Sequence, residues 1–446
     1  MLAPLTQPEH EDRIRIGNGC RSGPGLVISI SNRIEMENDV EIGPYVSLCD
    51  AASLDEVLRI PVPGKPASSA QSLLRIGERV RIGARATVAG SIHIGRWSVI
   101  QPGSVVVSDV PEACRVAGNP AVVTAVYDPA TCSWEDVGTP QEAEAALARR
   151  KNQPLLSICL PTYNREGHLH ACLNSIFSQI GATDLVEVIV SDNCSPDGTH
   201  EVAARFMEQY PNMRYVRNST NIGADRNIVQ VGEMAQGTFL KLHGDDDYFL
   251  PGTLRLLLST LHNHPDCSLI HTHPAGTDGK VTTGEGMKAY LAAASLHAIA
   301  MVQTSMRRRD WMSLENRDHW AYTSLSQIYW QYGMLARNPK FCILNLNLYW
   351  YAGTSPEGYN IGMVGIRNYE EALSQFEGGG LDRADIDAEM SRQLLHSILP
   401  IYRMFVQNRM DADFTDFEAY YTACYNHQPY YEQVLQEIRA LRAQEM

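Results

Sequence analysis

The 446-residue sequence has no surplus of positive charge: 37 Lys and Arg stand against 51 Asp and Glu, which gives a formal net charge of -14. A protein whose main partner is nucleic acid needs basic side chains to neutralise phosphates, so this balance argues against that class. A phosphorylated small substrate stays compatible, because a bound divalent cation offsets its charge. We therefore expect no nucleic-acid partner.

The sequence also lacks any apolar run of about 18 residues, the length that a membrane-spanning helix requires. Its first residues, MLAPLTQPEHEDR, have neither the basic start nor the apolar stretch of a signal peptide. We expect a cytoplasmic protein, with peripheral contact at the inner face of the membrane left open.

Paired cysteines are absent as well. The ten cysteines are scattered, and no two of them have the spacing of a zinc-ligand pair or a redox motif. This pattern predicts reduced, mostly buried thiols, as is usual in the cytoplasm. The length exceeds what one compact core holds, so we expect two or three domains.

What the first quarter does contain is a six-residue repeat. Aliphatic residues recur at Ile28, Ile34, Val40, Val46, Ile76, Ile82, Val88, Ile94, Ile100 and Val106. This period predicts short strands on the three sides of a prism, with one aliphatic residue per side pointing inward. Glycines follow several repeats (Gly43, Gly77, Gly83, Gly95), and we expect them at corners with unusual backbone dihedral angles.

Residues 13–123, which close with GSVVVSDVPEACRVAGNPA, resemble the left-handed parallel β-helix of hexapeptide-repeat acyltransferases. The resemblance implies a homotrimer, and in active members CoA between neighbouring coils. The resembling sugar O-acetyltransferases use a His shortly after an Asp as general base. Here the stretch from Cys49 through Asp50 to Ser53 has no His, and alternation points His93 outward. We expect an oligomerising domain, with sugar O-acetylation as the alternative.

Residues 124–153 are predicted to form a linker with a short helix. Thr139-Pro140-Gln141-Glu142 resembles a helix start, with Thr as the cap and Pro at the first helical position. The following Ala, Glu and Arg residues extend the helix to about Arg150.

From Leu155 onward apolar runs alternate with amphipathic stretches, which predicts a parallel α/β sheet. The expected strands are 155–160, 185–191, 213–218, 238–243 and 267–272, within a domain spanning 154–365. Ligands of such sheets gather at the carboxyl ends of the strands, and polar residues follow three of them. Residues 366–446 have a helical pattern and are predicted to form a C-terminal extension that covers the acceptor side or mediates assembly.

The acidic run Asp245-Asp246-Asp247 follows the fourth predicted strand. Adjacent carboxylates repel one another unless a cation or hydrogen-bond donors compensate. Mg²⁺ and Mn²⁺ prefer hard oxygen ligands, and one or two carboxylates suffice where phosphates and waters complete the shell. The run therefore predicts a Mn²⁺ or Mg²⁺ site; an Asp-rich turn that caps the next helix is the alternative.

Four motifs together resemble the GT-A nucleotide-diphospho-sugar transferase fold of inverting family 2 glycosyltransferases. They are LPTYNRE, VIVSDNCSPDGT, the Asn221-Ile222-Gly223 turn with Asn227, and GDDDYF. The residues of these motifs most resemble those of enzymes that build bacterial O-antigen and capsule sugars. The resemblance implies a nucleotide-diphospho-sugar donor and a glycan or lipid-linked acceptor. The competing hypothesis is a non-catalytic assembly protein that binds polysaccharide precursors. The acidic run argues against it, because a binding protein has no need for three adjacent carboxylates that repel one another.

The resemblance also implies roles at matching positions. Asp192 would read the base, three residues after the first strand would line the nucleoside pocket, and the turn would lie near ribose and diphosphate. These pocket and turn residues are Pro161, Thr162, Tyr163, Asn221 and Gly223.

In the same resemblance Asp245 and Asp247 are the D-x-D pair that binds donor and metal, and Asp246 faces the sugar or a neighbouring donor group. An inverting transferase further needs a base for the acceptor hydroxyl. We expect Asp318 in this role, with His319 and Glu315 as alternatives.

Overall fold

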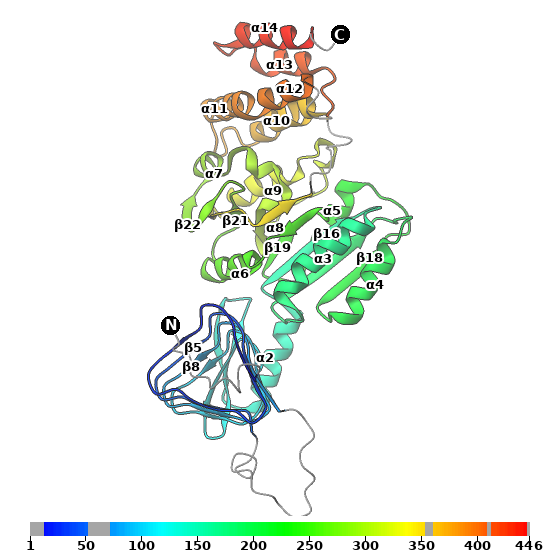
Figure 1. The fold of residues 1–446 in the computed structure, drawn as a ribbon. Coiled ribbons are helices and arrows are strands. Elements are labelled where there is room, and N and C mark those ends of the chain that lie inside the picture. Colours follow the sequence, from blue (N-terminus) through cyan, green and yellow to red (C-terminus); the bar gives the residue numbers. More distant parts are fainter. Residues whose placement is uncertain (1–12, 52–71, 353–359, 408–411, 444–446) are drawn as a thin grey trace, which may run out of the picture. The chain divides into compact units, whose positions relative to one another are not determined.

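The computed structural model describes residues 13–51, 72–352, 360–407 and 412–443. Contacts divide the chain into two compact units, 1–152 and 153–446 (Figure 1). None of the helices in the described ranges has the length and apolar character needed to span a bilayer.

The first unit is a coil whose strands fall on three faces. One parallel sheet contains β1 (Ile14–Ile16), β4 (Arg33–Met36), β7 (Leu73–Ile76) and β10 (His93–Ile94). A second contains β2 (Arg21–Ser22), β5 (Glu41–Ile42), β8 (Arg81–Ile82), β11 (Val99–Ile100) and β13 (Cys114–Gly118). The third contains β3 (Val27–Ser29), β6 (Ser47–Cys49), β9 (Thr87–Ala89) and β12 (Val105–Val106). Consecutive strands thus visit the three faces in turn, as the six-residue period predicts.

The register gives the length of one coil. From β7 to β12, residue 76 pairs with 94, residue 82 with 100 and residue 88 with 106, so these coils advance 18 positions, or three six-residue repeats. The first coil advances 20 positions, since residue 14 pairs with 34 and residue 21 with 41. Nine of the ten repeat residues are buried in one aliphatic core. The exception is the half-buried Ile28, because its strand β3 has a neighbouring coil on one side only.

Glycine is required at the repeat positions for a different reason from the one expected. Gly77, Gly83 and Gly95 do not have positive φ angles; left-handed backbone occurs instead at side-chain-bearing positions such as Arg79 and Arg85. A Cβ at Gly95 would lie 2.3 Å from the backbone nitrogen of Glu112, in the next coil. The expectation of unusual dihedral angles at these glycines is wrong, and the close approach of stacked coils is the reason for them.

Residues 124–152 continue the first unit. Antiparallel strands β14 (Ala121–Asp128) and β15 (Ser133–Asp136) extend the second sheet, and helix α2 (Pro140–Asn152) packs Ala143 and Ala146 into the core of the coil. Thr139 and Glu142 start the helix with reciprocal side-chain to backbone hydrogen bonds, a capping box.

The second unit is built on an eight-stranded sheet in the order β18-β17-β16-β19-β23-β21-β24-β22. Its strands are β16 (Leu156–Thr162), β17 (Val186–Asp192), β18 (Met213–Arg217), β19 (Phe239–Leu242), β21 (Leu269–Thr272), β22 (Thr277–Glu285), β23 (Thr304–Arg307) and β24 (Lys340–Leu346). The sheet is mixed rather than all parallel, because β23 runs antiparallel between β19 and β21, and β22 antiparallel to β24. Strand β23 was not predicted because only Met306 in it is apolar.

Helices α3 (Glu166–Ile180), α4 (Thr199–Gln209), α5 (Ala224–Glu233), α6 (Thr253–Asn263), α7 (Met287–Ala294), α8 (Arg308–Met312) and α9 (Ser326–Leu335) connect these strands. A separate ribbon pairs β20 (Asp247–Phe249) with β25 (Tyr349–Tyr351). Five helices follow: α10 (Tyr369–Ser374), α11 (Arg383–Gln393), α12 (Leu399–Val406), α13 (Phe417–Tyr425) and α14 (Tyr431–Arg442). They share one apolar core with the sheet, which includes Leu240, Tyr332, Leu394 and Tyr421.

Candidate active site

The acidic run lies where β19 ends. The chain leaves the buried strand at Leu242, turns at Gly244 and enters β20 at Asp247. Asp245 is buried, and its Oδ2 accepts a 2.7 Å hydrogen bond from Thr162 Oγ1 at the end of the neighbouring strand β16. The structure thus brings the first and fourth predicted strand ends together.

The other two carboxylates lie close over Gly244. A Cβ at this glycine would meet Asp247 Oδ2 at 2.6 Å and Asp246 Oδ1 at 2.9 Å, so a larger residue would displace both. Asp246 forms an ion pair of 3.4 Å with Arg165 at the start of α3. Asp247 pairs with Tyr351 in the β20–β25 ribbon.

The site disfavours charge on two of its three carboxylates. Burial, together with the charge of Asp246, raises the pKa of Asp245 to about 6, although the hydrogen bond from Thr162 opposes the shift. Burial and the charges of Asp246 and Asp245 raise the pKa of Asp247 to about 7. Carboxylates in this state gain most from an added cation. The donor set consists of hard oxygens and fits Mn²⁺ or Mg²⁺.

The protein supplies little positive charge beneath the run. Lys241 is fully buried, donates to Val302 O and lies over the Tyr349 ring at 4.9 Å. Burial lowers the pKa of Lys241 to about 7. Burial and Lys241 lower the pKa of His243 to about 3, and its Nε2 lies 2.9 Å from Asp247 O. Neither residue was predicted from the sequence, although two polar side chains at alternate positions of an otherwise apolar strand were a signal for them.

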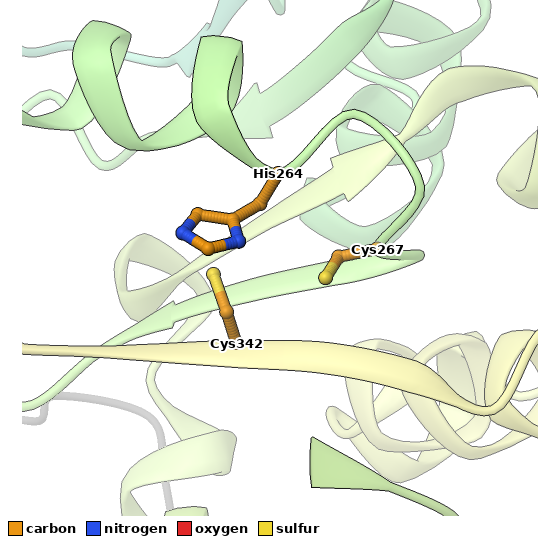
Figure 2. Close-up of side chains that lie close together, drawn as sticks. All are labelled: His264, Cys267 and Cys342. Atoms are coloured by element: carbon orange, nitrogen blue, oxygen red, sulfur yellow. The ribbon is translucent and has the colours of Figure 1, made fainter. Parts of the chain in front are cut away.

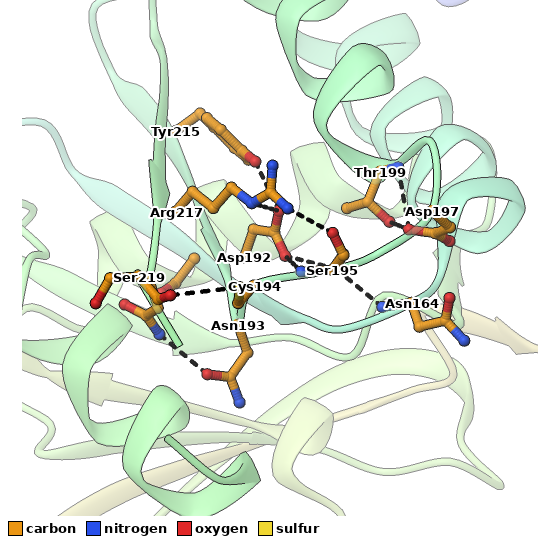
Figure 3. A network of polar contacts seen from close by, with 12 residues as sticks. Asn164, Asp192, Asn193, Cys194, Ser195, Asp197, Thr199, Tyr215, Arg217 and Ser219 are labelled. Atoms are coloured by element: carbon orange, nitrogen blue, oxygen red, sulfur yellow. Dashed lines mark hydrogen bonds and ion pairs between the residues drawn. The ribbon is translucent and has the colours of Figure 1, made fainter. Parts of the chain in front are cut away.

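Asp192 is enclosed by its own neighbours. Ser195 donates from both N and Oγ to its Oδ1, at 2.8 and 2.5 Å, and the Tyr215 hydroxyl donates to Oδ2 at 2.7 Å. Arg217 Nε lies 3.6 Å from the same Oδ2 (Figure 3). With none of the residue exposed, these contacts lock the ends of β17 and β18 together.

The turn at Asn221 is tied to this network. Asn193 donates from Nδ2 to Asn221 Oδ1 at 2.8 Å, and Gly223 N donates to the same oxygen at 2.9 Å. Gly223 has a φ of 90° and precedes α5, which has no side-chain cap. Of the residues predicted to line the nucleoside pocket, Pro161 is half-buried, Thr162 is buried, and Tyr163 is exposed.

The three residues predicted as candidates for the catalytic base lie in a different segment of the chain from the acidic run. Asp318, His319 and Glu315 are exposed, and the contacts described for the first two stay local: Asp318 O accepts from Ala321 N, and the His319 ring meets Trp320 edge-on. Their segment follows β23, which runs back toward the amino end of β19. Among the described contacts none joins them to the acidic run, and their role stays a prediction.

The aromatic side chains divide into two groups. Tyr329, Trp330 and Tyr332 are buried in the core. Trp350 and Tyr351 are exposed on β25, and Trp350 stacks on Tyr248 of β20 with ring centroids 5.5 Å apart. Only the second group lies on the ribbon that carries Asp247.

A stretch of each unit matches a known family model. Residues 157–326 match the family model "Glycosyl transferase family 2", and residues 74–108 match "Bacterial transferase hexapeptide (six repeats)". The chain therefore contains a family 2 glycosyltransferase domain fused to a hexapeptide-repeat domain.

Abequosyltransferase RfbV of Salmonella typhimurium is 36% identical over 125 residues, which cover 28% of this chain and 38% of that protein. The match thus spans well under half of the relative's length. Among solved structures, S. aureus TarS 1-349 in complex with UDP-GlcNAc aligns over 65% of this chain and 88% of that chain, with 15% identity and a TM-score of 0.44. The acetyltransferase VCA0836 from Vibrio cholerae aligns over 25% and 58%, with 29% identity and a TM-score of 0.21.

Proposed function

We propose that the chain is a metal-dependent, inverting glycosyltransferase. It moves a sugar from a nucleotide-diphospho-sugar to a glycan or lipid-linked acceptor in the synthesis of a bacterial surface polysaccharide, on the cytoplasmic side. The observation that carries the proposal is the crowding of three carboxylates at one strand end, two of them with raised pKa values. The acceptor class, the inversion and the biological role rest on the motif resemblance.

Asp245 and Asp247 would hold the cation as the D-x-D pair. A Mn²⁺ or Mg²⁺ ion bound there offsets the negative charge that develops on the departing diphosphate. Arg165 holds Asp246 to one side through its ion pair, and Thr162 orients Asp245. The chain thereby fixes the directions of the Asp245 and Asp246 carboxylates before the donor binds.

The donor's nucleoside and diphosphate would lie at the carboxyl end of β16 and the start of α5. Asp192 would act there through its hydrogen bonds, which hold Ser195 and Tyr215 in place. Helix α5 begins without a side-chain cap, so its first N–H groups suit a diphosphate oxygen. Asn221 fixes the turn that leads into this helix.

The acceptor sugar would lie against the β20–β25 ribbon. Trp350 exposes 57% of its surface there, and aromatic faces of this kind pack against the apolar faces of sugar rings. For the base that takes the proton of the acceptor hydroxyl we keep the residues predicted from the sequence, Asp318 first and His319 and Glu315 as the alternatives; no described contact joins them to this ribbon.

A donor panel tests the proposal directly. Purified chain is incubated with UDP-, GDP-, CDP- and dTDP-sugars, with Mn²⁺ or with EDTA, and release of nucleoside diphosphate is measured. We expect release from the donor of one nucleotide only, and only when the metal is present. Equal release in EDTA would contradict the metal requirement, and release from none of the donors would contradict the proposed reaction.

For the first unit we propose a left-handed coil that assembles the chain into a homotrimer. Exposed apolar side chains on its strands, among them Val27 and Val122, support an assembly role. Light scattering should then give three times 49.6 kDa, and a mass of one chain would contradict it. The acetylation alternative has less support, because Asp50 is buried and engaged by backbone N–H groups. Labelled acetyl-CoA should therefore leave no label on the glycan.

A further inference from the structure

His264, Cys267 and Cys342 form a cluster that the proposed sugar transfer does not use. One ligand atom from each lies within 4.8 Å of the other two, and Figure 2 shows His264 and Cys267, on the turn after α6, converging with Cys342 of β24. Both cysteines are buried and His264 is half-buried. Cysteine spacing alone does not reveal the group, since 75 positions separate its two sulfurs and the third member is a histidine.

The backbone around the cluster is held from both sides. His264 ends α6, and Cys267 N donates to His264 O at 3.2 Å, which closes a tight turn. Ser268 N then donates to Lys340 O at 2.8 Å and its Oγ to Asn338 O at 2.9 Å. Cys342 belongs to β24, an interior strand between β21 and β22. The three positions are therefore fixed by elements that would exist without any ligand.

We propose that His264, Cys267 and Cys342 bind a structural Zn²⁺ ion, with a water or the neighbouring exposed Asp266 in the fourth position. Zn²⁺ takes thiolate and imidazole ligands in tetrahedral geometry. In such a site ligand atoms lie roughly 3.5–3.8 Å apart, given Zn–S of about 2.3 Å and Zn–N of about 2.0 Å. The cluster, whose ligand atoms lie within 4.8 Å of one another, needs a contraction of at most about 1 Å to reach these separations. Two thiolates also cancel the charge of the ion, as a buried site requires.

The site's position argues for a structural role. Strands β19 and β21 both run antiparallel to β23 and thus in the same direction as each other. Cys267 precedes β21, whereas the acidic run follows β19, so the two sites occupy opposite edges of the sheet. A zinc ion here ties the end of α6 to β24 and leaves the sugar chemistry to the other edge.

Metal analysis of the full chain tests this. Protein purified without added zinc, or after one equivalent of Zn²⁺, should hold about one zinc per chain after gel filtration. The Asp245→Asn/Asp247→Asn double variant and Cys424→Ser, a half-buried thiol outside the cluster, should keep that zinc. Cys267→Ser and Cys342→Ser should lose it, and His264→Gln should bind it at least about 10-fold more weakly.

Co²⁺ substitution gives a second readout that needs no variant. Two thiolate ligands produce charge-transfer absorption in the near ultraviolet, whereas a carboxylate site does not. Absence of zinc from the wild type with no uptake, zinc loss in the double Asp variant, or retention in both Cys variants would each overturn the proposal. A Cys267–Cys342 disulfide in protein purified under reducing conditions would overturn it too. None of these results depends on sugar turnover, so the zinc site and the transferase proposal fail separately.

Discussion

Two carboxylates, one in each unit of the chain, have opposite environments. In the first unit Asp50 is fully buried, and its oxygens accept hydrogen bonds from Ser31 N, Asn32 N and Arg33 N at 2.5–2.7 Å. In the second, Asp247 has raised pKa through burial and two neighbouring carboxylates. The first carboxylate is satisfied by the fold, and the second is not.

The same contrast holds for the backbone. In the coil neighbouring turns approach so closely that Gly95 leaves no space for a Cβ, and the buried Asp50 accepts its hydrogen bonds from backbone within the stack. At the carboxyl edge of the large sheet, α5 begins without a side-chain cap. A fold that compensates its polar groups needs no ligand, whereas a fold that leaves them under-compensated at one edge is built to receive one.

The largest effect should come from Asp247→Asn, which removes a metal ligand and one of the crowded charges. We expect turnover to fall about 10²–10³-fold, the usual loss for one electrostatic stabiliser of a transition state. Without divalent cation the variant should be more stable than the wild type, because repulsion is relieved. Thermal unfolding in EDTA and donor hydrolysis in Mn²⁺ measure the two effects, with Glu418→Gln on α13 as the matched control. A variant that is less stable in EDTA would contradict the crowding argument.

Gly95→Ala tests the close approach of the coils. The added Cβ meets backbone atoms of Glu112 that cannot move aside, so we expect a loss of about 1–3 kcal/mol or more in the free energy of unfolding. Gly103→Asn is the control, since Gly103 has a φ of 73° and open space, and Asn tolerates that conformation. Denaturant titration of both variants decides whether sterics or dihedral angles set these positions. Equal losses would remove the steric explanation.

Asp50→Asn should weaken the first unit while turnover in the second is unchanged. The amide nitrogen replaces one acceptor and faces buried N–H donors, and each unsatisfied group costs about 1–3 kcal/mol. Limited proteolysis followed by mass spectrometry should detect earlier cleavage within residues 13–152. If the variant resists cleavage as the wild type does, Asp50 is not the structural carboxylate described above.

The smallest effect concerns His271, which is fully buried with Nδ1 3.0 Å from Thr304 Oγ1. Burial, aided by His297, His273 and Lys241, lowers its pKa from 6.5 to about 3. Between these values the unfolded chain binds a proton that the folded chain does not, so stability falls as pH falls below 6.5. Relative to His271→Gln, the wild type should lose up to about 1.4 kcal/mol per pH unit. Urea titrations of both proteins at pH 7 and pH 5 measure the difference, which would stay constant if the imidazole titrated normally.

Much of the architecture follows from periodicity, because an aliphatic residue at every sixth position, such as Val88 or Ile100, is buried only if each six-residue repeat forms one side of the coil. The strand ends at Thr162 and Asp245 were also predictable, since parallel neighbours end at the same edge and polar residues follow them. Strand β23 was not, because a strand inserted between two others needs little apolar sequence of its own.

In the candidate site, too, some features could be predicted from the sequence and others could not. Asp245, Asp246 and Asp247 could be found from charge crowding along the chain, but the raised pKa values depend on burial, which appears only in three dimensions. Asp318 was predicted as the base from its distance along the chain beyond the acidic run. That distance does not tell at which edge of the sheet the residue lies. His264, Cys267 and Cys342 come together only through the pairing of β21 with β24.

The 18-position register between β7 and β12 makes the height of the coil adjustable in whole steps. Removing residues 77–94 would join Ile76 to Gly95 and leave each inward residue above another aliphatic one. Adding such a segment would lengthen the stack by one strand spacing, about 4.8 Å. The first unit can therefore be read as a modular column, whose length changes without redesign of its interior.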